Sequence, residues 1–143
     1  MRYIGDYVGR VAITLILYLF LRLILMGIIN WYRRQKKPLP DVLMKINQFV
    51  IKTHRFVGVA ALGVVILHAF LQYRYYGIIP IAGLIAAIFL AIQLILGFTV
   101  RRQKEPERRK KLAFFHRMLG TLIVITVLVH RIIGARMGLN SRQ

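Results

Sequence analysis

The chain has 143 residues, of which 58% are hydrophobic, and it carries 22 lysines and arginines against only four carboxylates. A soluble domain of this size needs a polar exterior, and the long apolar runs leave no room for one. The absence of cysteine excludes disulfides, thiolate catalysis, iron–sulfur clusters and covalently attached haem. The composition therefore predicts a single integral membrane domain that covers residues 1–143.

Four apolar stretches have the length of membrane-spanning helices, at roughly residues 8–32, 54–73, 78–100 and 112–133. The first stretch is too long for the core of a signal peptide, so we expect it to be retained. Tyr7 lies near one end of this stretch and Trp31 near the other, as aromatic belts at two membrane surfaces require. We therefore predict an all-α, up-and-down four-helix membrane bundle, in which the second and fourth helices run in the same direction.

The connections between these stretches differ in character. Residues 42–53 alternate apolar and polar side chains after Pro38 and Pro40, which predicts an amphipathic segment lying at the membrane surface. Residues 73–77 are expected to form a short turn, and residues 101–111 a charged loop with Pro106 in its middle.

Most of the positive charge falls on one side of the predicted membrane. Residues 33–55 contain seven lysines and arginines and residues 101–117 contain eight, whereas the opposite side has six. Short basic loops stay in the cytoplasm, so we expect the cytoplasmic (inner) membrane of a cell, with both termini outside the cytoplasm. Acidic membrane lipid accounts for this charge, and no groove-reading element accompanies it, so we expect no nucleic-acid partner.

Every histidine belongs to one of two pairs with the same spacing. His54 and His68 lie in the second predicted span, His116 and His130 lie in the fourth, and the members of each pair are 14 residues apart. Fourteen residues are close to four helical turns, so both members project from one face, about 21 Å apart along the axis. Because the two helices are parallel, His54 should meet His116 near the inner surface, and His68 should meet His130 near the outer surface.

Two facing imidazoles at one depth form a bis-histidine axial site for haem iron, and the sequence predicts two such levels. Ionisable residues within a membrane are costly and usually functional, which favours ligation over a purely structural role. The alternatives are a relay for metal ions or protons and a set of structural hydrogen bonds. All four carboxylates lie in loops or near the chain ends, which disfavours a transport pathway.

Glycines accompany the histidines. Gly58 and Gly120 each follow a predicted inner histidine by one helical turn, and Gly83 and Gly97 in the third span are 14 residues apart. A missing side chain would let a flat macrocycle approach the backbone, and close helix packing is an equal alternative.

Arginines are the candidate partners of haem propionates. Arg55, Arg117 and Arg131 directly follow three of the histidines, and Arg22 lies well inside the first span. Arginine pairs well with a carboxylate, although the first three could instead reach lipid phosphates. Arg22 should face the bundle and meet a propionate or a quinone carbonyl, and Gln93 is a weaker polar candidate of the same kind.

His54, His68, His116 and His130, paired with this spacing on two helices of a four-helix core, resemble the dihaem membrane cytochromes b. This group includes the cytochrome b561 proteins, the haem-bearing half of respiratory cytochrome b and the ferric-reductase-type transmembrane domain. The resemblance covers the second to fourth spans and implies two non-covalent haem b groups and transmembrane electron transfer. It also implies a membrane subunit of a larger oxidoreductase or a quinone-linked protein, with other redox subunits or a quinone as partners.

Overall fold

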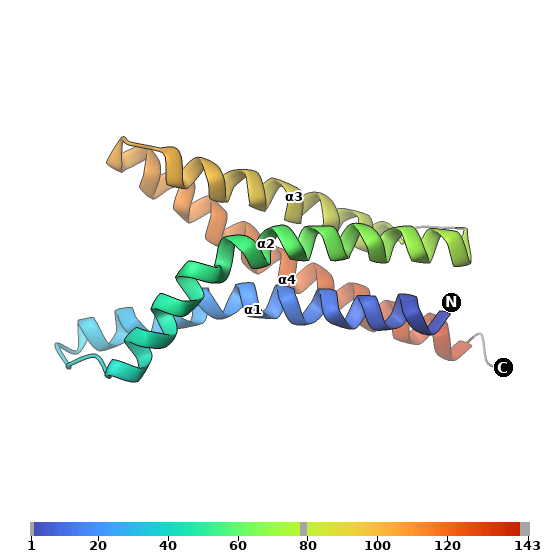
Figure 1. Cartoon of the computed structure of the whole chain (residues 1–143), viewed down its shortest axis with the longest axis horizontal. Coiled ribbons are helices and arrows are strands. Elements are labelled where there is room, and N and C mark those ends of the chain that lie inside the picture. Colours follow the sequence, from blue (N-terminus) through green and yellow to red (C-terminus); the bar gives the residue numbers. More distant parts are fainter. Residues whose placement is uncertain (1, 78–79, 141–143) are drawn as a thin grey trace.

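The computed structural model describes residues 2–77 and 80–140, and within them it consists of four helices without strands. These are α1 (Arg2–Arg34), α2 (Asp41–Tyr76), α3 (Ile81–Arg102) and α4 (Pro106–Asn140) (Figure 1). Each helix is long and apolar enough to cross a membrane. The predicted all-α four-helix bundle is confirmed, and its helices are those of a multi-pass membrane protein.

The four helices form two hairpins that pack against each other. α1 packs along α2 and α3 along α4, and smaller contacts join α2 to α3 and α1 to α4. Among the described residues the backbones of α2 and α4 make no direct contact, so these two helices lie diagonally across the bundle. They run in the same direction, and α1 begins at the end of the bundle where α4 finishes (Figure 1).

The second helix is longer than its predicted span at both ends. Residues 42–53, predicted as a separate amphipathic segment, are continuous with the rest of α2. Residues 73–76, predicted as a turn, also continue the helix, which ends only at Gly77. Gly77 adopts the left-handed conformation (φ 72°) and its N–H donates to the carbonyl of Tyr73 at 2.8 Å. Glycine is suited to this position because it lacks the Cβ that makes the conformation costly.

The predicted charged loop at residues 101–111 is wrong in its extent. Arg101 and Arg102 end α3, and α4 begins at Pro106, so only residues 103–105 connect the two helices. Proline is well tolerated at the first helical position, where its missing N–H would have no partner anyway. Ion pairs of Glu107 with Lys110 and of Glu105 with Arg108, both at 2.8 Å, support this first turn. The third helix begins at Ile81, and the predicted start at residue 78 lies outside the described residues.

The second helix bends in its first half (Figure 1). The Thr53 hydroxyl hydrogen bonds back to the carbonyls of Phe49 and Val50, an arrangement that often bends helices. The same hydroxyl also meets the Tyr18 hydroxyl of α1. This contact ties the two helices together one residue before His54.

The buried core is a single layer to which each helix contributes one side chain: Ile16, Ala61, Leu90 and Ile123. Ala61 lies seven residues from both His54 and His68, and Ile123 lies seven residues from both His116 and His130. Seven residues correspond to about 10 Å of helix. The core therefore closes the bundle midway between the two histidine levels.

Candidate functional site

The four histidines meet in two pairs across the bundle. The ring centres of His54 and His116 are 6.3 Å apart, and those of His68 and His130 are 6.4 Å apart. The two planes of each pair are steeply inclined, at 71° and 79° respectively. Because α2 and α4 are diagonal, the histidines project toward the centre from opposite sides. All four side chains are partly buried.

The separation within each pair suits a shared metal ion. A bond from imidazole nitrogen to a metal is about 2 Å long, and two imidazoles on opposite sides of one ion therefore have centres roughly 6 Å apart. Within the described residues no group of three or more histidines, cysteines or carboxylates comes together. A metal ion held by either pair would thus take its remaining ligands from a prosthetic group, as haem iron does.

Three histidine rings are seated against glycines of neighbouring helices. A Cβ at Gly83 would lie 3.2 Å from His130 Cε1, and a Cβ at Gly97 would lie 3.2 Å from His116 Cε1. The two glycines thus lie at the predicted outer and inner levels, and what each of them accommodates is an imidazole ring. On α1, a Cβ at Gly9 would lie only 2.8 Å from Cε1 of His68.

His68 also bonds to the backbone of α1. Its Nδ1–H donates to the carbonyl oxygen of Gly5 at 3.0 Å. Such a bond fixes the tautomer with the proton on Nδ1 and leaves Nε2 free to ligate a metal. Carbonyl partners of this kind are the usual outer support of metal-binding histidines.

The inner pair lacks that support. The Nδ1 atoms of His54 and His116 are both buried without a hydrogen-bond partner among the described residues. A buried polar atom without a partner is costly, and native structures contain few of them. The inner level is therefore incomplete as a purely structural arrangement of the protein's own groups.

Gln93 supports the inner level through the backbone of α4. Its Nε2 donates to the carbonyl of His116 at 2.8 Å. Gly120 makes room for this contact, because a Cβ there would lie 3.0 Å from the same nitrogen. Gly58 is buried against Leu94 and Leu19. Gly58 thus serves helix packing, and Gly120 serves the placement of Gln93.

The arginines that follow the histidines lie on the outside of the bundle. Arg55, Arg117 and Arg131 are all exposed. The Arg55 guanidinium lies over the ring of Phe56, 5.1 Å from its centre, and Arg117 Nε donates to the carbonyl of Ala113 at 3.2 Å. Successive helical residues are about 100° apart around the axis, so the neighbour of an inward-facing histidine points away. This placement favours lipid phosphates as the partners of these three arginines.

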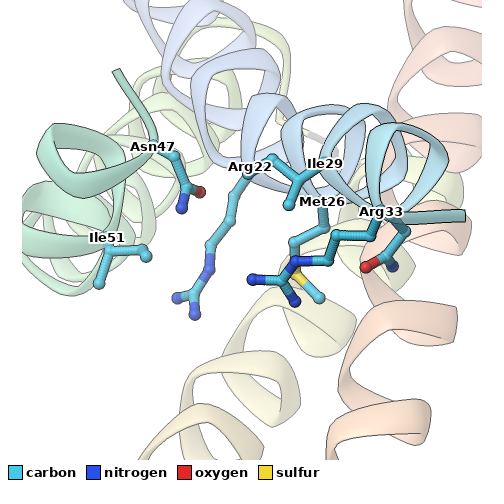
Figure 2. Close-up of a pocket in the computed structure, with 7 residues that line it drawn as sticks. Arg22, Met26, Ile29, Arg33, Asn47 and Ile51 are labelled. Carbon is cyan, nitrogen blue, oxygen red and sulfur yellow. The ribbon is translucent and has the colours of Figure 1, made fainter. Parts of the chain in front are cut away.

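Arg22 differs from them because it is partly buried near the inner histidine pair. It is close enough to His54 and His116 to interact electrostatically with both rings. Its side chain enters a pocket between α1 and the first turns of α2 (Figure 2). Arg22 is thus the one predicted arginine that the structure brings toward a histidine level.

Two residues of this site were missed by sequence reasoning. Gly5 and Gly9 are one turn apart near the start of α1, but position 23, 14 residues after Gly9, is leucine. The first helix therefore lacks the spacing that identified Gly83 and Gly97. The usable signal was depth, because Gly9 lies in the turn of α1 that is level with His68.

The residues present fit a bis-histidine haem at each level. The donor set is two imidazoles, their separation suits one shared iron, and glycines leave room for three of the rings. No protein-family model, characterised protein or solved structure matches the chain.

Proposed function

We propose that this protein carries electrons across a membrane through two non-covalent haem b groups. One is held by His54 and His116, and the other by His68 and His130. The observation that carries this proposal is the repetition of one geometry: two facing imidazole pairs, separated by 6.3 and 6.4 Å, at two depths of one bundle. A single pair could serve as a hydrogen-bonding element, but such an element needs no second copy at the spacing of a dihaem path.

Each haem, when bound, supplies a one-electron carrier through the ferric and ferrous states of its iron. The protein supplies orientation and insulation. The histidines set the two depths, about 21 Å apart along the helices. Ile16, Ala61, Leu90 and Ile123 close the space midway and exclude water from it. Electrons therefore cross a dry layer rather than a hydrated channel, which also disfavours a proton or metal-ion pathway.

The orientation follows from charge. The turns between α1 and α2 and between α3 and α4 lie at one end of the bundle, where the basic residues concentrate. We propose that this end faces the cytoplasm and that the protein lies in the cytoplasmic membrane with both termini outside the cytoplasm. Electrons enter and leave through a quinone or through redox subunits at the two surfaces.

The proposal is tested by the absorption spectrum of the purified protein, oxidised and then reduced with dithionite, with haem counted per chain. We expect two haems per chain and the spectrum of a low-spin b-type cytochrome. Acid–acetone should extract all of this haem, because the chain has no cysteine to hold it covalently. Pigment that stays on the chain would contradict the b-type assignment. A protein purified without haem would favour the transport alternative.

A further inference from the structure

A pocket of about 240 Å³ lies between the second half of α1 and the first turns of α2. Seven residues line it: Arg22, Met26, Ile29, Asn30, Arg33, Asn47 and Ile51. Figure 2 shows the side chains of Arg22 and Arg33 extending from α1 toward the same space, with Asn47 and Ile51 facing it from α2. The pocket thus combines two cations and two carboxamides with apolar walls.

No carboxylate lines this pocket. Glu105 and Glu107 form ion pairs at the start of α4, Asp6 lies near the opposite end of α1, and Asp41 begins α2. Cationic groups partly removed from water need a counter-charge, and their cost is greatest in a membrane. The arrangement therefore calls for an anion from outside the chain.

The polar groups are spread along the helix axis. Arg22 and Arg33 are 11 residues apart on nearly the same face of α1, which corresponds to about 16 Å. Arg33 and Asn30 lie at the surface end, and Arg22 lies toward the centre of the membrane. Met26 and Ile29 form the wall between them. A free anion such as phosphate is too small to satisfy both ends and leaves the apolar wall uncovered.

We propose that this pocket binds one molecule of an acidic phospholipid from the leaflet that faces the basic turns. Its phosphate meets Arg33 and Asn30, its ester carbonyls accept hydrogen bonds from Asn47 and Arg22, and its acyl chains cover the apolar wall. Arginine suits a phosphate because its planar group offers paired donors. This lipid site goes beyond electron transfer and does not require haem.

The position of the pocket favours an acidic lipid over other anions. Basic pockets between helices on the cytoplasmic side are suited to acidic lipid head groups, which are enriched in that leaflet. Lys36, Lys37 and Lys45 flank the pocket in sequence and add to the positive field. Trp31, exposed and contacted by Lys37 at 5.4 Å from its ring centre, marks the depth of the membrane surface beside it.

The test is native mass spectrometry of the delipidated, detergent-solubilised protein, titrated with phosphatidylglycerol or with phosphatidylcholine of the same acyl chains. We expect one phosphatidylglycerol to bind with higher affinity than phosphatidylcholine. Arg33→Gln and Asn47→Leu should each weaken that binding by about tenfold. Arg102→Gln is the matched control, because it removes the same charge from an exposed position at the same end of the bundle. It should leave the affinity unchanged.

Three outcomes would overturn the proposal. Equal binding of the two lipids would remove the head-group preference, and equal losses in Arg33→Gln and Arg102→Gln would reduce it to general surface charge. Displacement of phosphatidylglycerol by millimolar inorganic phosphate would identify a free anion as the ligand. Haem counted on the same samples separates this test from the electron-transfer proposal, because Arg33→Gln should retain the haem content of the unmodified protein.

Discussion

The two histidines of each pair have unequal surroundings. His68 donates from Nδ1 to the carbonyl of Gly5, whereas His54 and His116 have buried Nδ1 atoms without partners among the described residues. A hydrogen bond at Nδ1 makes the imidazole a more basic ligand. The outer level is therefore set by the backbone of α1, and the inner level depends more on Gln93 and on whatever the pair binds.

Replacing single histidines tests which pairs share a cofactor. His54→Ala or His116→Ala should each remove the inner haem, and His68→Ala or His130→Ala should each remove the outer one, because each haem needs both of its axial ligands. Haem content should fall from two per chain to about one. Reduced-minus-oxidised spectra of the four variants should fall into two classes. Identical spectra for His54→Ala and His68→Ala, with His116→Ala different, would contradict the pairing across the bundle.

At the scale of the helices, α2 and α4 supply the ligands while α1 and α3 supply the surfaces on which the rings rest. Gly9, Gly83 and Gly97 belong to these supporting helices, and in each case the space left by the glycine is occupied by an imidazole. Glycine weakens a helix by about 1 kcal/mol relative to alanine. This cost is offset only if the contact that it permits is required.

Alanine at these glycines should therefore perturb one level at a time. Gly9→Ala places a Cβ 2.8 Å from His68 Cε1 and should disturb the outer haem, whereas Gly97→Ala crowds His116 and should disturb the inner one. Such overpacking typically costs about 1–3 kcal/mol and turns the ring away from its position. Electron paramagnetic resonance of the oxidised protein should show the low-spin signal of one haem shifted in each variant.

Gly63→Ala is the control for this pair of variants. Nothing lies within 4 Å of a Cβ built at Gly63, so the substitution removes a glycine from the interior of α2 without a new contact. Both low-spin signals should stay as in the unmodified protein. A shift of the outer signal in Gly97→Ala would mean that the glycines act on the whole bundle rather than on one ring.

For the whole molecule, the two hairpins meet along a closed middle layer, with a histidine level on either side. α1 begins and α4 ends at one end of the bundle, and the basic connections lie at the other (Figure 1). The side of the membrane that each end faces decides which haem exchanges electrons with the cytoplasm.

Cysteine labelling tests this orientation in a chain that has no native cysteine. A cysteine in place of Ser141, beyond the described residues, should react with a membrane-impermeant maleimide in intact spheroplasts. A cysteine in place of Gln103, between α3 and α4, should react only after the membrane is opened, because short basic connections stay in the cytoplasm. The reverse labelling pattern would exchange the inner and outer levels.

The sequence by itself determined the number of helices and the pairing of the histidines. Both depend on one-dimensional regularities: apolar runs of membrane length, and a 14-residue spacing that returns a side chain to the same helical face. The ends of the helices were less well predicted. Charged residues after Pro106 and before His54 resemble loops by composition, but proline and carboxylates in a first turn stabilise a helix there.

Only the tertiary structure decided which residues support each histidine. Gly5 and Gly9 act through contacts between α1 and α2, and Gln93 acts through a backbone carbonyl of α4. Arg55 and Arg22 have the same side chain, yet one is exposed beside Phe56 and the other enters a pocket near the inner pair. Spacing along one helix fixes the face on which a residue lies. The depth and rotation of the neighbouring helix decide what that face meets.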